Sequence, residues 1–176
     1  MKNLAFIILT CFTLTLTAQQ TVKSKVLKLK YTMPAGWNVQ EFGSPASVNW
    51  EEQGNNLCKC SGILFFKSHA DGKMNVLVYP STQSGLDSAK RNAVGNLAFV
   101  DVQKYDKTKN KFFSFERKKS NFTDSKTKAK SYEVFRYFAK IEDHFYIIYA
   151  WQENMQMLNS TNEKVLWEMV NGIEPL

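Results

Sequence analysis

Two cysteines separated by a single residue, Cys58 and Cys60, are the most reactive pair in the sequence. Residues i and i+2 of an extended strand lie near the upper limit of bridging distance, so a disulfide here needs a turned backbone. The preceding residues 54–56, Gly-Asn-Asn, favour such a turn. The pair therefore has three interpretations: a structural bridge or two buried thiols, a thiol-exchange site, or a Cu(I) site.

The two functional interpretations depend on neighbouring residues. Lys59 and Lys67 could lower the pKa of a nearby thiol, as thiol exchange requires. Two thiolates also suit a soft ion such as Cu(I), to which Met155 and Met157 would add thioether ligands. The scaffold motifs that usually surround either kind of site are missing. A thiol-redox or Cu(I)-handling protein that uses Cys58 and Cys60 is therefore the alternative hypothesis.

Other catalytic signatures are missing from the sequence. His69 and His144 are its two histidines, and each lies in an expected turn close to an aspartate, where an exposed histidine needs no special role. A zinc site would need further Cys, Asp or Glu ligands from elsewhere in the chain. There is no Gly-x-Ser-x-Gly elbow, His-Glu-x-x-His pair or phosphate-binding glycine loop. We therefore predict no catalytic residues, no metal site, no cofactor and a protein that is not an enzyme.

Positive charge is concentrated in residues 104–130, which carry ten basic and three acidic residues and so a formal charge of +7, as much as the whole chain. Residues 141–176 carry six acidic residues against one lysine, so the molecule should be electrically lopsided. Five lysines in the most polar part of the basic tract are the predicted partner-binding residues: Lys118, Lys119, Lys126, Lys128 and Lys130. The tract would attract an acidic protein or an anionic component of the cell envelope, or it would serve only as a solubilising surface.

Residues 1–18 read as a secretory signal peptide. Lys2 supplies the positive start, an apolar segment follows, and Ala18 is the small residue at which cleavage is expected. Lipidation at Cys11 is not expected because the apolar segment continues beyond it. The apolar run is shorter than the ~20 residues of a membrane span. We predict an exported protein, periplasmic or secreted, whose residues 19–176 form one domain, and export argues against a nucleic-acid partner.

The elements that must position these residues are mostly strands. Residues 131–152 alternate as two strands joined by a turn at Glu142, Asp143 and His144, and both faces carry aromatic or branched side chains. Such a hairpin belongs in the middle of a sheet that is covered on both sides. A second hairpin is expected at residues 62–67 and 75–79, around Asp71 and Gly72.

Two helices are expected, at residues 86–99 and after the capping-box sequence at residues 160–163, the second ending near Gly172. The remaining expected strands cover residues 21–31, 39–42, 46–50, 101–105 and 111–117, and residues 118–130 are expected to form a solvated loop or hairpin tip. This order predicts an α+β fold in which helices sandwich an antiparallel sheet.

Three features of the sequence belong together: the turn at residues 33–37, Met-Pro-Ala-Gly-Trp; the Asn75-Val76-Leu77-Val78 strand that runs into a proline and then a helix; and the tyrosine-rich hairpin before a closing helix. In this order they resemble the PsbP-like fold. The resemblance covers residues 31–173. It implies an antiparallel sheet between helices and carries over no catalytic residues. Because members of this group mostly bind proteins, the resemblance implies a non-catalytic binding module, although fold analogy alone does not assign a function.

Overall fold

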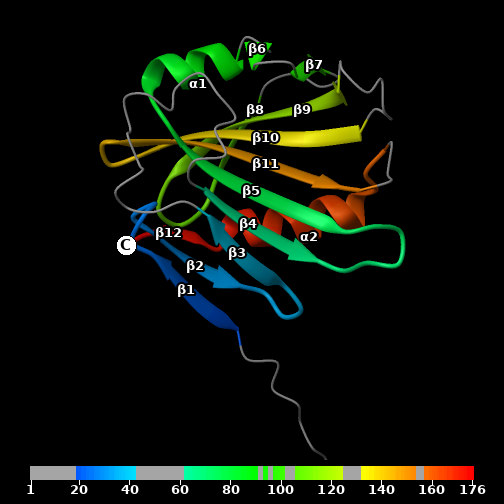
Figure 1. Ribbon diagram of the computed structural model, residues 1–176, viewed down its shortest axis with the longest axis horizontal. Helices are drawn as coiled ribbons and strands as arrows, with labels where there is room; N and C mark the ends of the chain where they lie inside the picture. The colour runs from blue at the N-terminus through cyan, green and yellow to red at the C-terminus, as the bar shows by residue number, and fades with distance from the viewer. Residues whose placement is uncertain are drawn as a thin grey trace, which may run out of the picture.

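The computed structural model describes residues 19–42, 62–90, 93–94, 97–101, 106–124, 132–153 and 157–176. Within them the chain forms two sheets and two helices (Figure 1). The nine-stranded sheet has the order β3-β4-β5-β11-β10-β9-β7-β6, with β8 beside β9, and the small sheet has the order β1-β2-β12. All pairings are antiparallel. The strands are β1 Gln20–Ser24, β2 Leu29–Met33, β3 Asn38–Phe42, β4 Gly62–Lys67, β5 Met74–Ser81, β6 Ala93–Val94, β7 Leu97–Asp101, β8 Asp106–Lys109, β9 Ser114–Asp124, β10 Tyr132–Ile141, β11 His144–Gln152 and β12 Ile173–Pro175.

The central hairpin is formed by β10 and β11, as predicted, in register from Val134 with Trp151 to Ile141 with His144. The turn takes up Glu142 and Asp143, with Glu142 at φ 53, so His144 already belongs to β11. β5 and β9 flank the hairpin on its two sides, which places it in the middle of the sheet. The hairpin is apolar on both faces because other elements pack against each face of the sheet.

The two helices cover opposite faces of the large sheet (Figure 1). Helix α2, Ser160–Asn171, packs with Leu166, Met169 and Val170 against the face that carries Tyr137, and the small sheet completes this core. Helix α1, Gln83–Lys90, packs with Leu86 and Ala89 against the face that carries Phe138. The predicted α+β sandwich of an antiparallel sheet between helices is confirmed. We call its two sides the α2 face and the α1 face.

The first helix is shorter than predicted, because α1 ends at Lys90 and residues 93–94 and 97–101 are strands β6 and β7. The apolar spacing that suggested a helix to residue 99 was misleading. β7 pairs with the far half of β9, from Leu97 with Asp124 to Asp101 with Ser120. Long-range hydrogen bonds of this kind outweigh the local helix propensity, which the glycine at position 95 lowers further. Residues 97–101 therefore form a strand and do not continue the helix.

The expected loop or hairpin tip at residues 118–130 is wrong for residues 118–124, and residues 125–130 lie outside the described residues. β9 runs on to Asp124, so residues 118–124 are strand. The segment at residues 21–31 is likewise a hairpin of β1 and β2, with a turn at Lys28 (φ 53), and not one edge strand.

Helix α2 begins one residue earlier than the capping-box sequence implied. Asn159 is the N-cap, and its side-chain oxygen accepts a hydrogen bond from the backbone N–H of Asn162 at 2.8 Å. Gly172 is the C-cap, as expected, and its close approach to the carbonyl of Thr32 leaves no room for a Cβ atom. Predicted strand 46–50 lies outside the described residues.

Candidate functional site: the α1 face

Two basic side chains from the sheet bind the C-terminal end of α1. Arg136 on β10 donates to the carbonyl oxygen of Ala89 at 2.9 Å, and Lys118 on β9 donates to that of Lys90 at 2.8 Å. The last carbonyls of a helix have no intrahelical donor and carry partial negative charge, so cations there are stabilising. Lys118, a predicted partner-binding residue, therefore caps the C-terminal end of α1.

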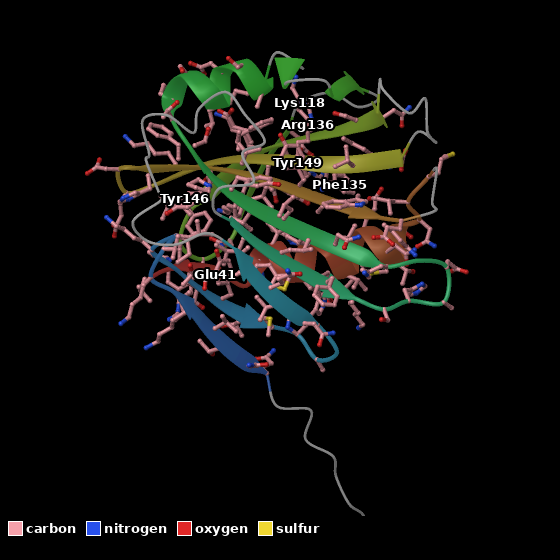
Figure 2. All side chains as sticks on the ribbon, viewed as in Figure 1. Glu41, Lys118, Phe135, Arg136, Tyr146 and Tyr149 are labelled. Atoms are coloured by element: carbon pink, nitrogen blue, oxygen red, sulfur yellow. The ribbon has the colours of Figure 1, made fainter. Side chains whose placement is uncertain are left out.

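Arg136 is fully buried, at 0% exposure, in the layer between α1 and the sheet (Figure 2). Its Nε donates to the hydroxyl of Ser120 at 3.1 Å, and its guanidinium lies 5.8 Å from the ring centroid of Phe138. Burying a charge is costly unless its donors are satisfied, and these contacts satisfy several of them. No role was assigned to Arg136 from the sequence. The available signal was an arginine at an otherwise apolar position.

A cavity of about 450 Å³ lies beside this buried layer. One stripe of α1 forms a wall through Gln83, Leu86 and Lys90, and strands β8 to β11 form the rest. The strand residues are Lys107 from β8, Ser114, Phe115 and Glu116 from β9, Phe138 and Lys140 from β10 and Phe145 from β11. Register explains the assembly, because Lys107 pairs with Glu116, Glu116 with Phe138, and Lys140 with Phe145. Four of these residues lie in the basic tract at residues 104–130, but the others come from three distant segments, so sequence reasoning did not find the site.

The cavity is electropositive, because it is lined by three lysines and one glutamate. Lys90 pairs with Glu116 at 2.5 Å and lies 6.0 Å from the ring centroid of Phe138. Lys107 and Lys140 are exposed, and neither forms an ion pair with another described residue. Lys140 instead lies 5.5 Å from the ring centroid of Phe145. The arrangement offers two uncommitted ammonium groups above an apolar floor, which suits an anion.

On the α2 face, by contrast, the basic side chains of β9 are neutralised. Lys119 binds Glu163 at 2.7 Å and Glu133 at 3.1 Å, and its side chain is only 17% exposed. Burial alone would lower the pKa of Lys119, but its bonds to the two carboxylates outweigh burial and raise it. Arg117 pairs with Asp106 at 2.6 Å and lies 5.2 Å from the ring centroid of Phe135, and the bond to Asp106 is the main cause of its raised pKa. These cations stabilise the fold.

The predicted partner-binding lysines are thus divided. Lys118 and Lys119 are neighbours on β9 whose side chains reach opposite faces, and each contacts a different helix. Lys126, Lys128 and Lys130 lie outside the described residues. The exposed cations in the described part of the tract are Lys107, Lys109 and Lys111.

The junction of the two sheets holds a separate polar cluster. Tyr146 donates to the carbonyl of Leu27 at 2.5 Å, and Ser24 donates to Glu41, which Figure 2 labels below Tyr146. The hydroxyl of Tyr31 is buried there without a partner among the described residues. Burial, then the charges of Tyr146 and Glu41, raises the pKa of Tyr31 well above its usual value. A phenol held neutral in this way is a poor general base near pH 7.

The two histidines lie in different elements, because His69 lies between β4 and β5 and His144 is the first residue of β11 rather than a turn residue. His69 Nδ1 accepts from the backbone N–H of Asp71 at 3.3 Å and lies 3.3 Å from Nε2 of the buried Gln152. Burial, and then the charge of Lys28, lowers the pKa of His144. Among the described residues no three His, Cys, Asp or Glu side chains gather as metal ligands. Cys58 and Cys60 lie outside the described residues, so the redox and Cu(I) interpretations stay predictions.

Comparison with known proteins identifies the fold. No family model matches the chain, and no curated protein matches it in sequence. The solution structure of cyanobacterial PsbP (CyanoP) from Synechocystis matches with a TM-score of 0.50 at 9% identity, over 95% of this chain and 98% of that chain. The chain therefore has a PsbP-like fold, as the sequence resemblance predicted. In the part of the chain that the structure describes, no helix is long and apolar enough to cross a membrane.

Proposed function

We propose that this chain is an exported, non-catalytic binding module that recognises an acidic protein through a basic edge of its large sheet. We define the basic edge as Lys107, Lys109 and Lys111, which lie on β8 and in the turn that follows it. The carrying observation is that all three are exposed and that none forms an ion pair with another described residue. Their charge is therefore available to a partner, whereas Arg117 and Lys119 form ion pairs with carboxylates of the same chain.

The basic edge also offers an apolar anchor. Phe112 is 45% exposed, and the ammonium group of Lys111 lies 5.4 Å from its ring centroid. Aromatic side chains, phenylalanine included, are enriched at protein–protein interfaces. This combination favours an acidic protein over a purely charged surface such as an anionic bilayer.

Lysines on an edge strand have a second explanation. They discourage edge-to-edge pairing with another chain, and β8 is an edge of the large sheet among the described strands. The two explanations make different predictions, because a solubilising edge needs charge but no partner, whereas a binding edge gives saturable, salt-dependent association. Lys126, Lys128 and Lys130, which lie outside the described residues, stay predicted partner-binding residues.

A short polyglutamate peptide is the probe that tests the basic edge. We expect saturable binding that weakens as salt rises, and a loss of about tenfold in affinity for Lys109→Glu with Lys111→Glu, because charge reversal at the contact repels the peptide. The matched control is Lys23→Glu with Lys25→Glu, two exposed lysines of the β1–β2 hairpin. An equal loss in the control would show that only total charge matters and would contradict the proposal.

The export half of the proposal has its own test. We expect the mature protein to begin at Gln19, because Ala18 ends the apolar segment as a small residue. Intact-mass measurement of protein recovered outside the cytoplasm checks this. A retained segment 1–18, or a lipid on Cys11, would contradict it.

A further inference from the structure

The cavity on the α1 face has the size and construction of a small-molecule site. Its volume of about 450 Å³ falls within the ~300–1,000 Å³ that is usual for ligand pockets. Five separate elements contribute to its wall, α1 and β8 to β11. The packed layer around Arg136 lies directly beside it, which holds α1 at a fixed position over the sheet. The cavity is therefore preformed.

The floor of the cavity is apolar. Leu86 and Phe138 are buried, at 4% and 2% exposure, and belong to the core cluster between α1 and the sheet. Phe145 is half-buried and packs against the same cluster. The apolar part of a ligand could therefore bury its surface against two aromatic rings and a leucine, which is favourable because it removes apolar surface from water.

The rim supplies positive charge at two separate points. Lys107 extends from β8, and Lys140 extends from the end of β10, on the same face of the sheet. The third lysine, Lys90, is committed to Glu116. Lys140 lies above the ring of Phe145, so one ammonium group and one aromatic surface face the same space. A ligand that satisfies both must carry an anion next to an apolar group.

We propose that this cavity binds an amphiphilic organic anion, with its apolar body against Leu86, Phe138 and Phe145 and its carboxylate or sulfonate between Lys107 and Lys140. This site goes beyond the proposed protein-binding function. Lys107 belongs to both surfaces, but Lys109 and Lys111 do not line the cavity and Lys140 is not part of the basic edge, so the Lys109 and Lys111 variant separates the two functions experimentally. Binding needs no covalent step.

Two naphthalene dyes of similar shape test the site. 1-Anilinonaphthalene-8-sulfonate carries the anion, and N-phenyl-1-naphthylamine lacks it. We expect the folded protein to bind the sulfonate with one-site saturation, and decanoate to displace it. Lys107→Ser with Lys140→Ser should weaken sulfonate binding by about tenfold and change binding of the neutral dye by less than about twofold. Phe145→Ser should weaken both dyes, because it removes part of the floor.

Two controls make the test decisive. Lys23→Ser with Lys25→Ser removes the same charge from the β1–β2 hairpin and should leave sulfonate binding unchanged. Near-ultraviolet circular dichroism must show native packing in each variant, because loosely packed states also bind the sulfonate dye. No sulfonate binding by the wild type, or an equal loss in the hairpin control, would overturn the proposal. So would a parallel loss of both dyes in the Lys107 and Lys140 variant.

Discussion

The two faces of the large sheet are built differently. On the α2 face, Tyr137 stacks on Trp167 and Phe115 packs edge-to-face against both, with ring centroids 5.8 Å apart in each pair. The basic groups of β9 on this face are paired with carboxylates. On the α1 face, an eight-residue helix covers a smaller cluster, and a cavity with two uncommitted lysines lies at its side. The difference suggests a division of work, in which the α2 face stabilises the fold and the α1 face leaves charge available for binding.

Truncating neighbouring residues of β10 tests this division most strongly. Tyr137 and Phe138 are both buried but reach opposite faces. Tyr137→Ala should lower the free energy of unfolding by about 3–5 kcal/mol, the usual range for a large core aromatic. Phe138→Ala should cost less, because it borders a cavity that water can enter. Urea unfolding measures both, and equal losses would remove the asymmetry.

Neighbouring lysines of β9 give the next largest effect. Lys119→Met leaves Glu133, 8% exposed, without its cation, and should cost about 2–3 kcal/mol. Lys118→Met removes a bond to the end of α1 and should cost about 1 kcal/mol or less, the usual contribution of a cation at a helix C-terminus. Both values come from urea unfolding. A larger cost for Lys118 would mean that the α1 face depends on its charges for stability.

Two buried tyrosines should ionise in a fixed order at high pH. Burial raises the pKa of Tyr79, on the α1 side, to about 12, and burial raises that of Tyr137 further still. A raised folded-state pKa means that the stabilising contribution is complete below about pH 10, the unfolded value, and is lost as pH rises through the folded value. Absorbance at 295 nm, followed with circular dichroism, should show Tyr79 ionising before Tyr137. Tyr79→Phe should remove the earlier step, and its persistence would contradict the assignment.

The smallest effect on binding is expected for the cysteine pair. Cys58→Ser with Cys60→Ser should change the free energy of unfolding by at most a few kcal/mol, because so small a loop restrains the unfolded chain little. Binding of the polyglutamate peptide and of the sulfonate dye should not change. Loss of either, or of a measurable reductase activity, would move the functional site away from the α1 face and support the redox or Cu(I) alternative.

Local patterns predicted the parts of the fold that form locally. The β10–β11 hairpin, the β4–β5 hairpin and helix α2 each carry their own alternation, turn or cap within a short segment. The end of α1 and the length of β9 depend on pairing between residues distant in sequence, from Leu97 with Asp124 to Asp101 with Ser120. Hydrophobic periodicity within one segment contains no information on such partners.

The candidate site was harder to predict for the same reason. The lysine tract can be recognised in the sequence. Which of its lysines bond to other groups of the chain depends on where α1 and α2 pack against the sheet. Lys118 and Lys119 look equivalent in the sequence and contact different helices in the structure. The cavity combines residues from Gln83 to Phe145, so only the folded chain brings them together.

Mapping the polyglutamate peptide by backbone amide chemical shifts tests the central claim most directly, because it locates the contact without any substitution. We predict salt-sensitive shifts at Lys107, Lys109 and Lys111, while α2 and the β1–β2 hairpin stay unchanged. Shifts concentrated on α2 or on the β1–β2 hairpin, or spread evenly over all exposed lysines, would contradict the claim that the basic edge is the binding surface.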